Sequence, residues 1–145
     1  MSSLVSVVVP FFNEEENVRP LAESIQKVFA TMPEFEYECV FVNDGSTDKT
    51  RAVLESISED NPHIRPVHLV RNSGQSAAIV AGMRRARGEY ILMLDGDLQN
   101  DPCDFPKMLE LLRDYDCVFG YRAKRQDSSL RKVASRIANR ARQWW

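Results

Sequence analysis

The sequence predicts an α/β fold in which a mostly parallel sheet is flanked by helices. Short runs rich in β-branched residues alternate along the chain with segments of helical periodicity, an order typical of a parallel sheet covered on both faces. The 145 residues suit a single domain with its own core, and 43% hydrophobic and 28% charged residues are an ordinary balance for a globular chain.

The pattern can be divided into individual elements. Ser46 or Thr47 is expected to cap the second helix, and Pro66 favours an edge position for the third strand. The last helix has one apolar face, made of Phe105, Met108, Leu109 and Leu112. We expect strands at residues 4–10, 37–44, 64–70, 90–94 and 117–121, and helices at residues 17–29, 46–60, 74–86 and 104–115.

Composition and charge exclude several classes of protein. Three cysteines without CxxC spacing argue against disulfides and a zinc site, so Cys39 and Cys117 are expected in the core. No run reaches the roughly 20 apolar residues of a membrane span, and the first residues lack the features of a signal peptide. A cytoplasmic location is therefore expected.

The charge is distributed unevenly along the chain. Residues 122–145 carry eight Lys or Arg and one acid, although the net charge of the whole chain is −2. A basic tail on an acidic body indicates an anionic partner. Its apolar stripe and terminal Trp144 and Trp145 are typical of a helix at a membrane surface, but a helix docked on the sheet is an equal alternative. No zinc-finger or RNA-binding pattern supports nucleic acid as the partner.

Polar residues are concentrated where the predicted strands end. The segments "PFFNEEEN", "NDGSTD", "RNSGQ" and "DGDLQND" follow the first four strands in turn. Ligands of such sheets bind outside the carboxyl ends of the strands, so this rim is the expected site. The rim lacks GxGxxG and GxxxxGK[ST], and its acids would repel a bare diphosphate.

Two of the rim acids indicate a metal site. Asp95 and Asp97 stand two residues apart at a strand end, and Gln99 adds a neutral oxygen. An all-oxygen ligand set favours Mg²⁺ or Mn²⁺. The alternative is that the acids cap the helix that begins near Pro102. Asp101 fits that role, whereas Asp95 and Asp97 come too early in the sequence.

Five ordered segments resemble a known family. They are "VSVVVPFFNEEENV", "VFVNDGSTDKT", "RNSGQSAAIVAG", "YILMLDGDLQNDP" and "GYRAKRQDSSLRKVASRIANR". Together they resemble the GT-A, Rossmann-like catalytic domain of family 2 glycosyltransferases. The segments are most similar to the polyprenyl-phosphate type, which includes dolichyl-phosphate mannose synthase, bactoprenol glucosyltransferases and the undecaprenyl-phosphate aminoarabinose transferase.

The resemblance implies an enzyme that moves a sugar, with inversion, from a UDP- or GDP-linked donor to a polyprenyl phosphate. The metal would stabilise the leaving diphosphate, and Asp127 occupies the place where a base has been proposed in similar enzymes. The implied catalytic residues are Asp97, Asp127 and Arg122, and the implied metal ligands are Asp95, Asp97 and Gln99. The implied donor-binding residues are Pro10, Phe12, Asn13, Glu14, Asp44, Arg71, Asn72, Gly74 and Asp95, and the implied acceptor-phosphate residues are Arg122, Arg125, Arg131 and Ser135.

Enzymes of this type continue beyond the point that corresponds to Trp145. The resemblance therefore implies that residues 1–145 are the nucleotide-sugar-binding part of one catalytic domain, truncated before the rest of the acceptor site and any membrane helices. The expected location is the cytoplasmic face of a membrane. A non-catalytic nucleotide-binding or membrane-peripheral fragment of such an enzyme is the alternative.

Overall fold

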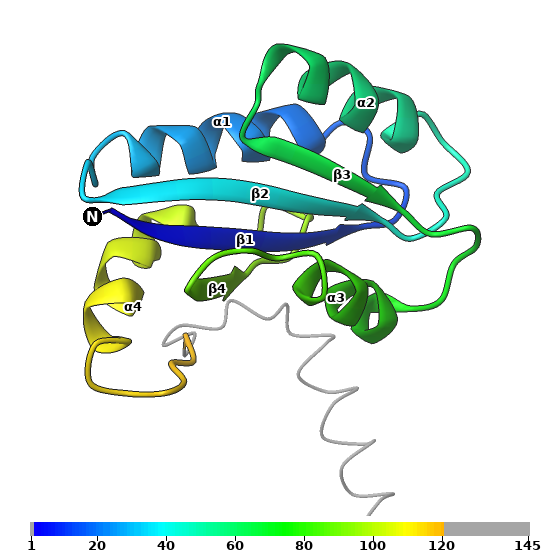
Figure 1. The fold of residues 1–145 in the computed structure, drawn as a ribbon. Coiled ribbons are helices and arrows are strands. Elements are labelled where there is room, and N and C mark those ends of the chain that lie inside the picture. The colour runs from blue at the N-terminus through cyan, green and yellow to red at the C-terminus, as the bar shows by residue number, and fades with distance from the viewer. Residues whose placement is uncertain (1, 121–145) are drawn as a thin grey trace, which may run out of the picture.

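The computed structural model describes residues 2–120, and Figure 1 shows their arrangement. The strands β1 (Ser3–Phe11), β2 (Phe35–Asn43), β3 (Ile64–His68) and β4 (Tyr90–Met93) form one sheet in the order β3-β2-β1-β4, and every neighbouring pair is parallel. The helices are α1 (Val18–Phe29), α2 (Thr50–Asp60), α3 (Gln75–Met83) and α4 (Phe105–Leu111), and the short helix η1 (Pro102–Asp104) precedes α4.

The two faces of β1 contact different helices. Successive side chains of a strand point to opposite faces, so Val5, Val7 and Val9 face one side and Val8 the other. The first set belongs to a buried cluster with α1 and α2, and Val8 packs with Ala78 of α3. Figure 1 accordingly shows α1 and α2 on one side of the sheet and α3 on the other. Burial on both faces explains why β1 is an almost continuous apolar run.

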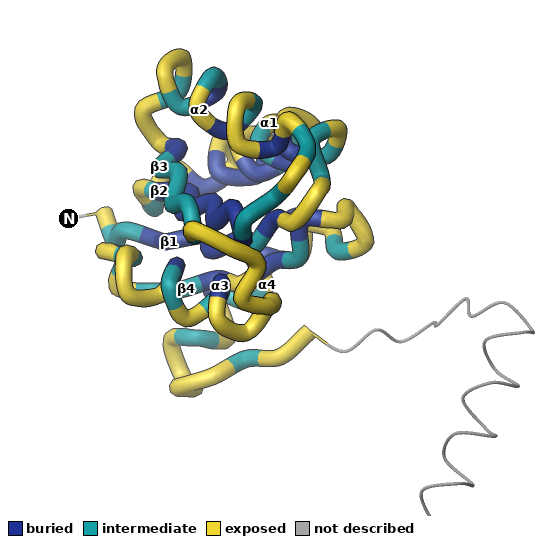
Figure 2. Tube along the Cα trace, turned by 90° about the vertical axis from the view of Figure 1, so that its right-hand side faces the viewer, coloured by how far each residue is buried: buried dark blue, intermediate teal, exposed yellow. Residues whose placement is uncertain are grey.

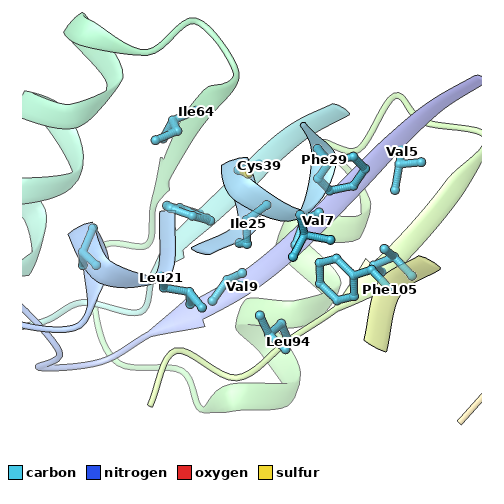
Figure 3. Packing of buried hydrophobic residues seen from close by; sticks show 14 of the residues in the cluster. Val5, Val7, Val9, Leu21, Ile25, Phe29, Cys39, Ile64, Leu94 and Phe105 are labelled. Atoms are coloured by element: carbon cyan, nitrogen blue, oxygen red, sulfur yellow. The ribbon is translucent and has the colours of Figure 1, made fainter. Parts of the chain in front are cut away.

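The larger cluster also joins the end of the described chain to its beginning. Phe105 of α4 lies beside Phe29 of α1, with ring centroids 6.2 Å apart, and both side chains are buried. Figure 3 shows this packing, and Figure 2 shows the buried strands between exposed loops. The expected apolar face of α4 is confirmed, because Phe105 and Leu109 are buried and Met108 and Leu112 pack against the cluster.

Gly82 brings α3 close to the sheet. A Cβ at this position would lie 2.4 Å from Cγ1 of Val8 and 2.9 Å from Cγ2 of Val42. Real Cβ atoms do not approach other atoms so closely, so a glycine is needed for the observed contact. The position of α3 matters for the site, because the first residue of α3 lies at the rim of the sheet.

The structure confirms the four predicted helices and the first four predicted strands, with shifted ends. Pro66 lies in an edge strand, as predicted. The predicted caps Ser46 and Thr47 are wrong, because α2 begins at Thr50. Both residues instead bind the β1–α1 loop: the N–H of Asn13 donates to Oγ of Ser46, and the N–H of Thr47 donates to Oδ1 of Asn13.

The prediction of a fifth strand is wrong for residues 117–120, which have no regular secondary structure. The segment "CVFG" has strand propensity, but a strand also needs a hydrogen-bonded neighbour. Cys117 was expected in the core and is exposed, whereas Cys39 is buried as predicted. All three cysteines are free thiols. Among residues 2–120, no helix is long and apolar enough to cross a membrane.

Candidate functional site

A cleft of about 360 Å³ lies at the carboxyl ends of the strands. In chain order β1 leads to β2 and β3 on one side, while β4 lies on the other side of β1. Such a reversal of strand order is where open α/β sheets bind ligands. The cleft is lined by Pro10, Phe11, Phe12, Glu14, Asp44, Asn72, Gly74, Gln75, Asp95, Gly96 and Asp97.

The loop after β1 contributes an aromatic ring and a carboxylate. Phe12 is 44% exposed and lines the cleft, so its ring is available for stacking. Glu14 is fixed by its backbone, whose N–H donates to Oγ1 of Thr50 at 2.9 Å. Its carboxylate accepts a hydrogen bond from the side chain of Asn17. The loop is therefore held in place by α2 and by the start of α1.

Asp44, directly after β2, is a buried carboxylate that lines the cleft. It is 3% exposed, and its two oxygens accept hydrogen bonds from the backbone N–H groups of Ser73 (2.7 Å) and Gly74 (2.9 Å). These bonds fix the loop that leads into α3. Gly74 has a φ of +89°, a conformation that side chains disfavour, and a Cβ there would meet no atom within 4 Å. Glycine is therefore required here by the backbone conformation and not by a close contact.

The acids after β4 are arranged by local hydrogen bonds. Oδ1 of Asp95 accepts from Nε2 of Gln75 at 2.6 Å, and its Oδ2 accepts from Nδ2 of Asn100 at 3.3 Å. Oδ1 of Asp97 accepts from the backbone N–H of Gln99 at 3.0 Å. Asp95 and Asp97 both line the cleft. The turn that carries them thus presents two carboxylates to one space.

Asp101 is a helix cap, as predicted. Its Oδ1 accepts a hydrogen bond from the backbone N–H of Cys103 at the start of η1, at 2.9 Å. This hydrogen bond lowers the pKa of the Asp101 carboxyl below its ordinary value. Asp101 is not among the residues that line the cleft. The cap and the candidate metal ligands are therefore different acids, although they lie close together in the sequence.

Eight of the predicted site residues meet in the cleft. Three others, Asn13, Arg71 and Gln99, are described by the structure but do not line it. Asn13 has a φ of +56° and binds the β2–α2 loop through Thr47. The residues that line the cleft as predicted are Pro10, Phe12, Glu14, Asp44, Asn72, Gly74, Asp95 and Asp97. The predicted residues Arg122, Arg125, Asp127, Arg131 and Ser135, and the predicted membrane-binding tail, lie outside the described residues.

Gln75 is the polar cleft residue that sequence reasoning missed. It stands in the rim segment "RNSGQ", which was recognised as polar, but no local pattern connects it to Asp95, twenty positions later. The sequence feature that could have pointed to Gln75 is its position directly after Gly74, at the expected start of a helix that faces the rim.

The donor set of the cleft fits a hard cation better than zinc. Its charged groups are the carboxylates of Glu14, Asp44, Asp95 and Asp97. Oxygen ligands suit Mg²⁺ and Mn²⁺, which keep positions open for water and phosphate oxygens. Within residues 2–120, no group of three or more His, Cys, Asp or Glu side chains could enclose a metal by itself.

A parallel sheet with an acidic cleft at its topological switch point defines an open α/β fold with a ligand site as the class of protein. Comparison with known families identifies it further. The family described as "Glycosyl transferase family 2" matches residues 6–144, and the chain belongs to this family. The family resemblance seen in the sequence is thereby confirmed.

Curated relatives extend the comparison. The chain is 43% identical over 139 residues to the dodecaprenyl-phosphate galacturonate synthase of Rhizobium johnstonii, covering 93% of this chain and 41% of that protein. It is 42% identical over 137 residues to the undecaprenyl-phosphate 4-deoxy-4-formamido-L-arabinose transferase of Photorhabdus laumondii, covering 93% of this chain and 42% of the relative. The chain thus spans about two fifths of the length of these relatives.

Solved structures confirm the GT-A fold. The chain superimposes with a TM-score of 0.67 on a mannosyltransferase from Pyrobaculum calidifontis in complex with GDP-Man and Mn²⁺, at 24% identity, covering 79% of this chain and 33% of that one. It superimposes with a TM-score of 0.63 on residues 1–349 of TarS from S. aureus in complex with UDP-GlcNAc, at 23% identity, covering 89% and 38%. Both neighbours hold a nucleotide sugar, and the first also holds a divalent metal ion.

Proposed function

We propose that this chain is the donor-binding part of a glycosyltransferase that moves a sugar from a nucleoside-diphosphate sugar to a polyprenyl phosphate with the help of a divalent metal ion. The observation that carries the proposal is the convergence of Asp44, Asp95 and Asp97 with Phe12 in one cleft at the switch point of the sheet. The acceptor class is supported by the names of relatives that are about two fifths identical to the chain.

Asp44 and Phe12 form the proposed subsite for the base. A carboxylate offers about four acceptor positions, and Asp44 uses two of them for the N–H groups of Ser73 and Gly74. The remaining capacity can accept the imide N–H of uracil or guanine, while the ring of Phe12 stacks on the base. Neither interaction distinguishes UDP from GDP, so both remain donor candidates. Asn72, which also lines the cleft, is assigned to the same subsite.

Asp95 and Asp97 form the proposed subsite for the diphosphate and its metal ion. We assign both carboxylates as ligands of Mg²⁺ or Mn²⁺. The side chain of Gln99, which does not line the cleft in this structure, is assigned as a neutral third ligand once the cation is bound. When bound, the cation neutralises the charge that develops on the departing nucleoside diphosphate. The carboxylates orient that cation and exclude a bare diphosphate, because four acids line the cleft without a balancing Lys or Arg among the lining residues.

The transfer itself breaks the bond from the sugar C1 to the diphosphate oxygen and forms a bond from C1 to an acceptor phosphate oxygen on the opposite face. A phosphate monoester has a second pKa of about 6, so this oxygen is already anionic near neutral pH. A general base is accordingly not essential. The proposal also includes the acceptor side. It assigns the acceptor phosphate to Arg122, Arg125, Arg131 and Ser135, an auxiliary role as a base to Asp127, and the membrane contact to the basic tail.

The proposal is tested by thermal unfolding with UDP, GDP, CMP and their sugar conjugates, each in Mn²⁺ and in EDTA. A uridine or guanosine diphosphate should stabilise the protein by about 2.7 kcal/mol at 100 times its dissociation constant, and only with the metal. Asp97→Asn should abolish the effect. Asp60→Asn is the matched control, because Asp60 is exposed at the end of α2 remote from the cleft. Equal stabilisation in EDTA would contradict the metal assignment, and no stabilisation by any nucleotide would refute the proposed function.

A further inference from the structure

The side chain of Gln75 crosses from the start of α3 to the end of β4. Its Nε2 donates a hydrogen bond of 2.6 Å to Oδ1 of Asp95, while Nδ2 of Asn100 donates to Oδ2 of the same carboxylate. Each oxygen of Asp95 therefore has an amide donor, one from each side. Two donors on opposite oxygens define both the rotamer and the plane of a carboxylate.

Gln75 is itself placed by the buried carboxylate of Asp44, which also lines the cleft. Asp44 accepts the backbone N–H groups of Ser73 and Gly74, the two residues that directly precede Gln75. The left-handed conformation of Gly74 then turns the chain into α3. The three residues 73–75 thus connect Asp44, after β2, to Asp95, after β4.

The hydrogen bond from Gln75 does not serve the stability of the fold. Gln75 is exposed, and a hydrogen bond between exposed groups adds little to the free energy of folding, because both groups are hydrogen-bonded to water in the unfolded chain. The helix α3 is anchored elsewhere, by Ala78 and Gly82, which are buried against the sheet. What the bond determines is the orientation of a carboxylate that lines the cleft.

We propose that Gln75 is a positioning residue that fixes the Asp95 carboxylate in the orientation needed to receive the metal–diphosphate group. The inference rests on the proposed function, since it assigns a further residue to the same site. Groups that orient a metal ligand typically contribute 10- to 100-fold to metal affinity. Gln75 acts through Asp95 alone, so its removal should weaken metal-linked nucleotide binding and leave the fold unchanged.

The first test compares Gln75→Met, which keeps the length of the side chain without the donor, and Gln75→Glu, which puts a second carboxylate against Asp95. Gln26→Met and Gln26→Glu are matched controls, because Gln26 is an exposed glutamine of α1 outside the cleft. Titration calorimetry measures the affinity for UDP and GDP in Mn²⁺ and in EDTA, and the difference is the metal-linked affinity. Binding of Mn²⁺ alone is followed by electron paramagnetic resonance.

We expect a loss of about 10-fold or more in Mn²⁺-linked affinity for Gln75→Met and a larger loss for Gln75→Glu. The midpoint of thermal unfolding without ligand should not change, and in EDTA neither the wild type nor the variants should bind the nucleotide. Gln75 variants that behave like the Gln26 controls, while the wild type binds with metal, would overturn the positioning role alone. A lower midpoint of thermal unfolding for Gln75→Met without ligand would also overturn it, because the residue would then serve the fold. A wild type that binds no metal-linked nucleotide would instead refute the proposed function.

A second measurement needs no nucleotide. The side-chain amide of Gln75, identified in the nuclear magnetic resonance spectrum by its loss in Gln75→Met, should shift when Asp95→Ala removes its acceptor. The Gln26 amide should not shift in the same variant. A Gln75 amide that is unaffected by Asp95→Ala would show that the bond does not exist in solution, and would overturn the inference independently of any binding result.

Discussion

Replacing Glu38 by Gln tests the buried charged group of the sheet. Glu38 lies on β2 and is 6% exposed. Its carboxylate accepts hydrogen bonds from Oγ of Ser6 on β1 (2.7 Å), from Nη1 of Arg65 on β3 (2.5 Å) and from the backbone N–H of Arg87 just before β4 (2.7 Å). One side chain thus joins three strands to the chain segment that leads to the fourth.

The structure sets the expected magnitude. Glutamine has the same shape but no charge, and one of its two terminal positions becomes a donor where Glu38 only accepts. Removing one partner of a buried ion pair costs about 3–5 kcal/mol. The Arg65 side chain is 28% exposed and also donates to the carbonyl of Arg85, so it is partly compensated. We therefore expect Glu38→Gln to lower the free energy of unfolding by about 2–4 kcal/mol, somewhat less than the full penalty for breaking a buried ion pair.

The same carboxylate predicts a dependence on pH. Burial alone would raise the pKa of Glu38, but the hydrogen bonds from Ser6, Arg65 and Arg87 outweigh burial and hold the pKa below its ordinary value. A carboxyl whose pKa is lower in the folded state contributes stability that is fully present above its unfolded pKa of about 4.3. That contribution is lost as the pH falls through the folded pKa. The wild type should therefore lose more stability than Glu38→Gln when the pH falls below about 4.3.

Urea unfolding at pH 7 and at about pH 3.5 is the assay. Glu36→Gln is the matched control, because Glu36 stands two positions earlier on the same strand but is exposed, and its carboxylate accepts from Ser2. The reasoning is refuted if Glu38→Gln and Glu36→Gln have the same unfolding midpoint at pH 7. It is also refuted if the difference between them does not shrink in acid.

Two further predictions concern packing and thiol chemistry. Gly82→Ala should lower the free energy of unfolding by about 1 kcal/mol, although alanine has the better helix propensity, because its Cβ would lie 2.4 Å from Cγ1 of Val8. Urea unfolding is the measurement, and a variant more stable than the wild type would contradict the prediction. Ellman's reagent should react with two thiols of the native protein, the exposed Cys103 and Cys117. It should reach Cys39 only after unfolding, because that side chain is buried and burial raises its pKa. A third thiol that reacts rapidly in the native protein would contradict this.

The element order and the position of the rim follow from local sequence. Period-two and period-3.6 patterns depend only on which face of an element is buried, so the alternation of strands and helices was predictable. Asp95 and Asp97 were recognisable for the same reason, because acids directly after an apolar strand must lie at its carboxyl end. The capping role of Asp101 is a local bond between near neighbours and was equally predictable.

The failures occur where distant segments compete for the same groups. Ser46 and Thr47 have good capping propensity, but Asn13, more than thirty positions earlier, binds both of them. Cys117 lies in an apolar run, yet no neighbouring strand covers it among residues 2–120. Propensity describes one segment alone and carries no information about the partner that the fold supplies.

The sequence by itself thus determined the α/β class, the family and the edge of the sheet where the ligand site lies. Only the tertiary structure decided which polar groups of that edge meet. Asp44 faces Ser73 and Gly74, and Gln75 reaches Asp95, because the strand order β3-β2-β1-β4 brings these loops around one cleft. Hydrogen bonds act over about 3 Å, so a pair that is twenty or thirty positions apart exists only once the chain has folded.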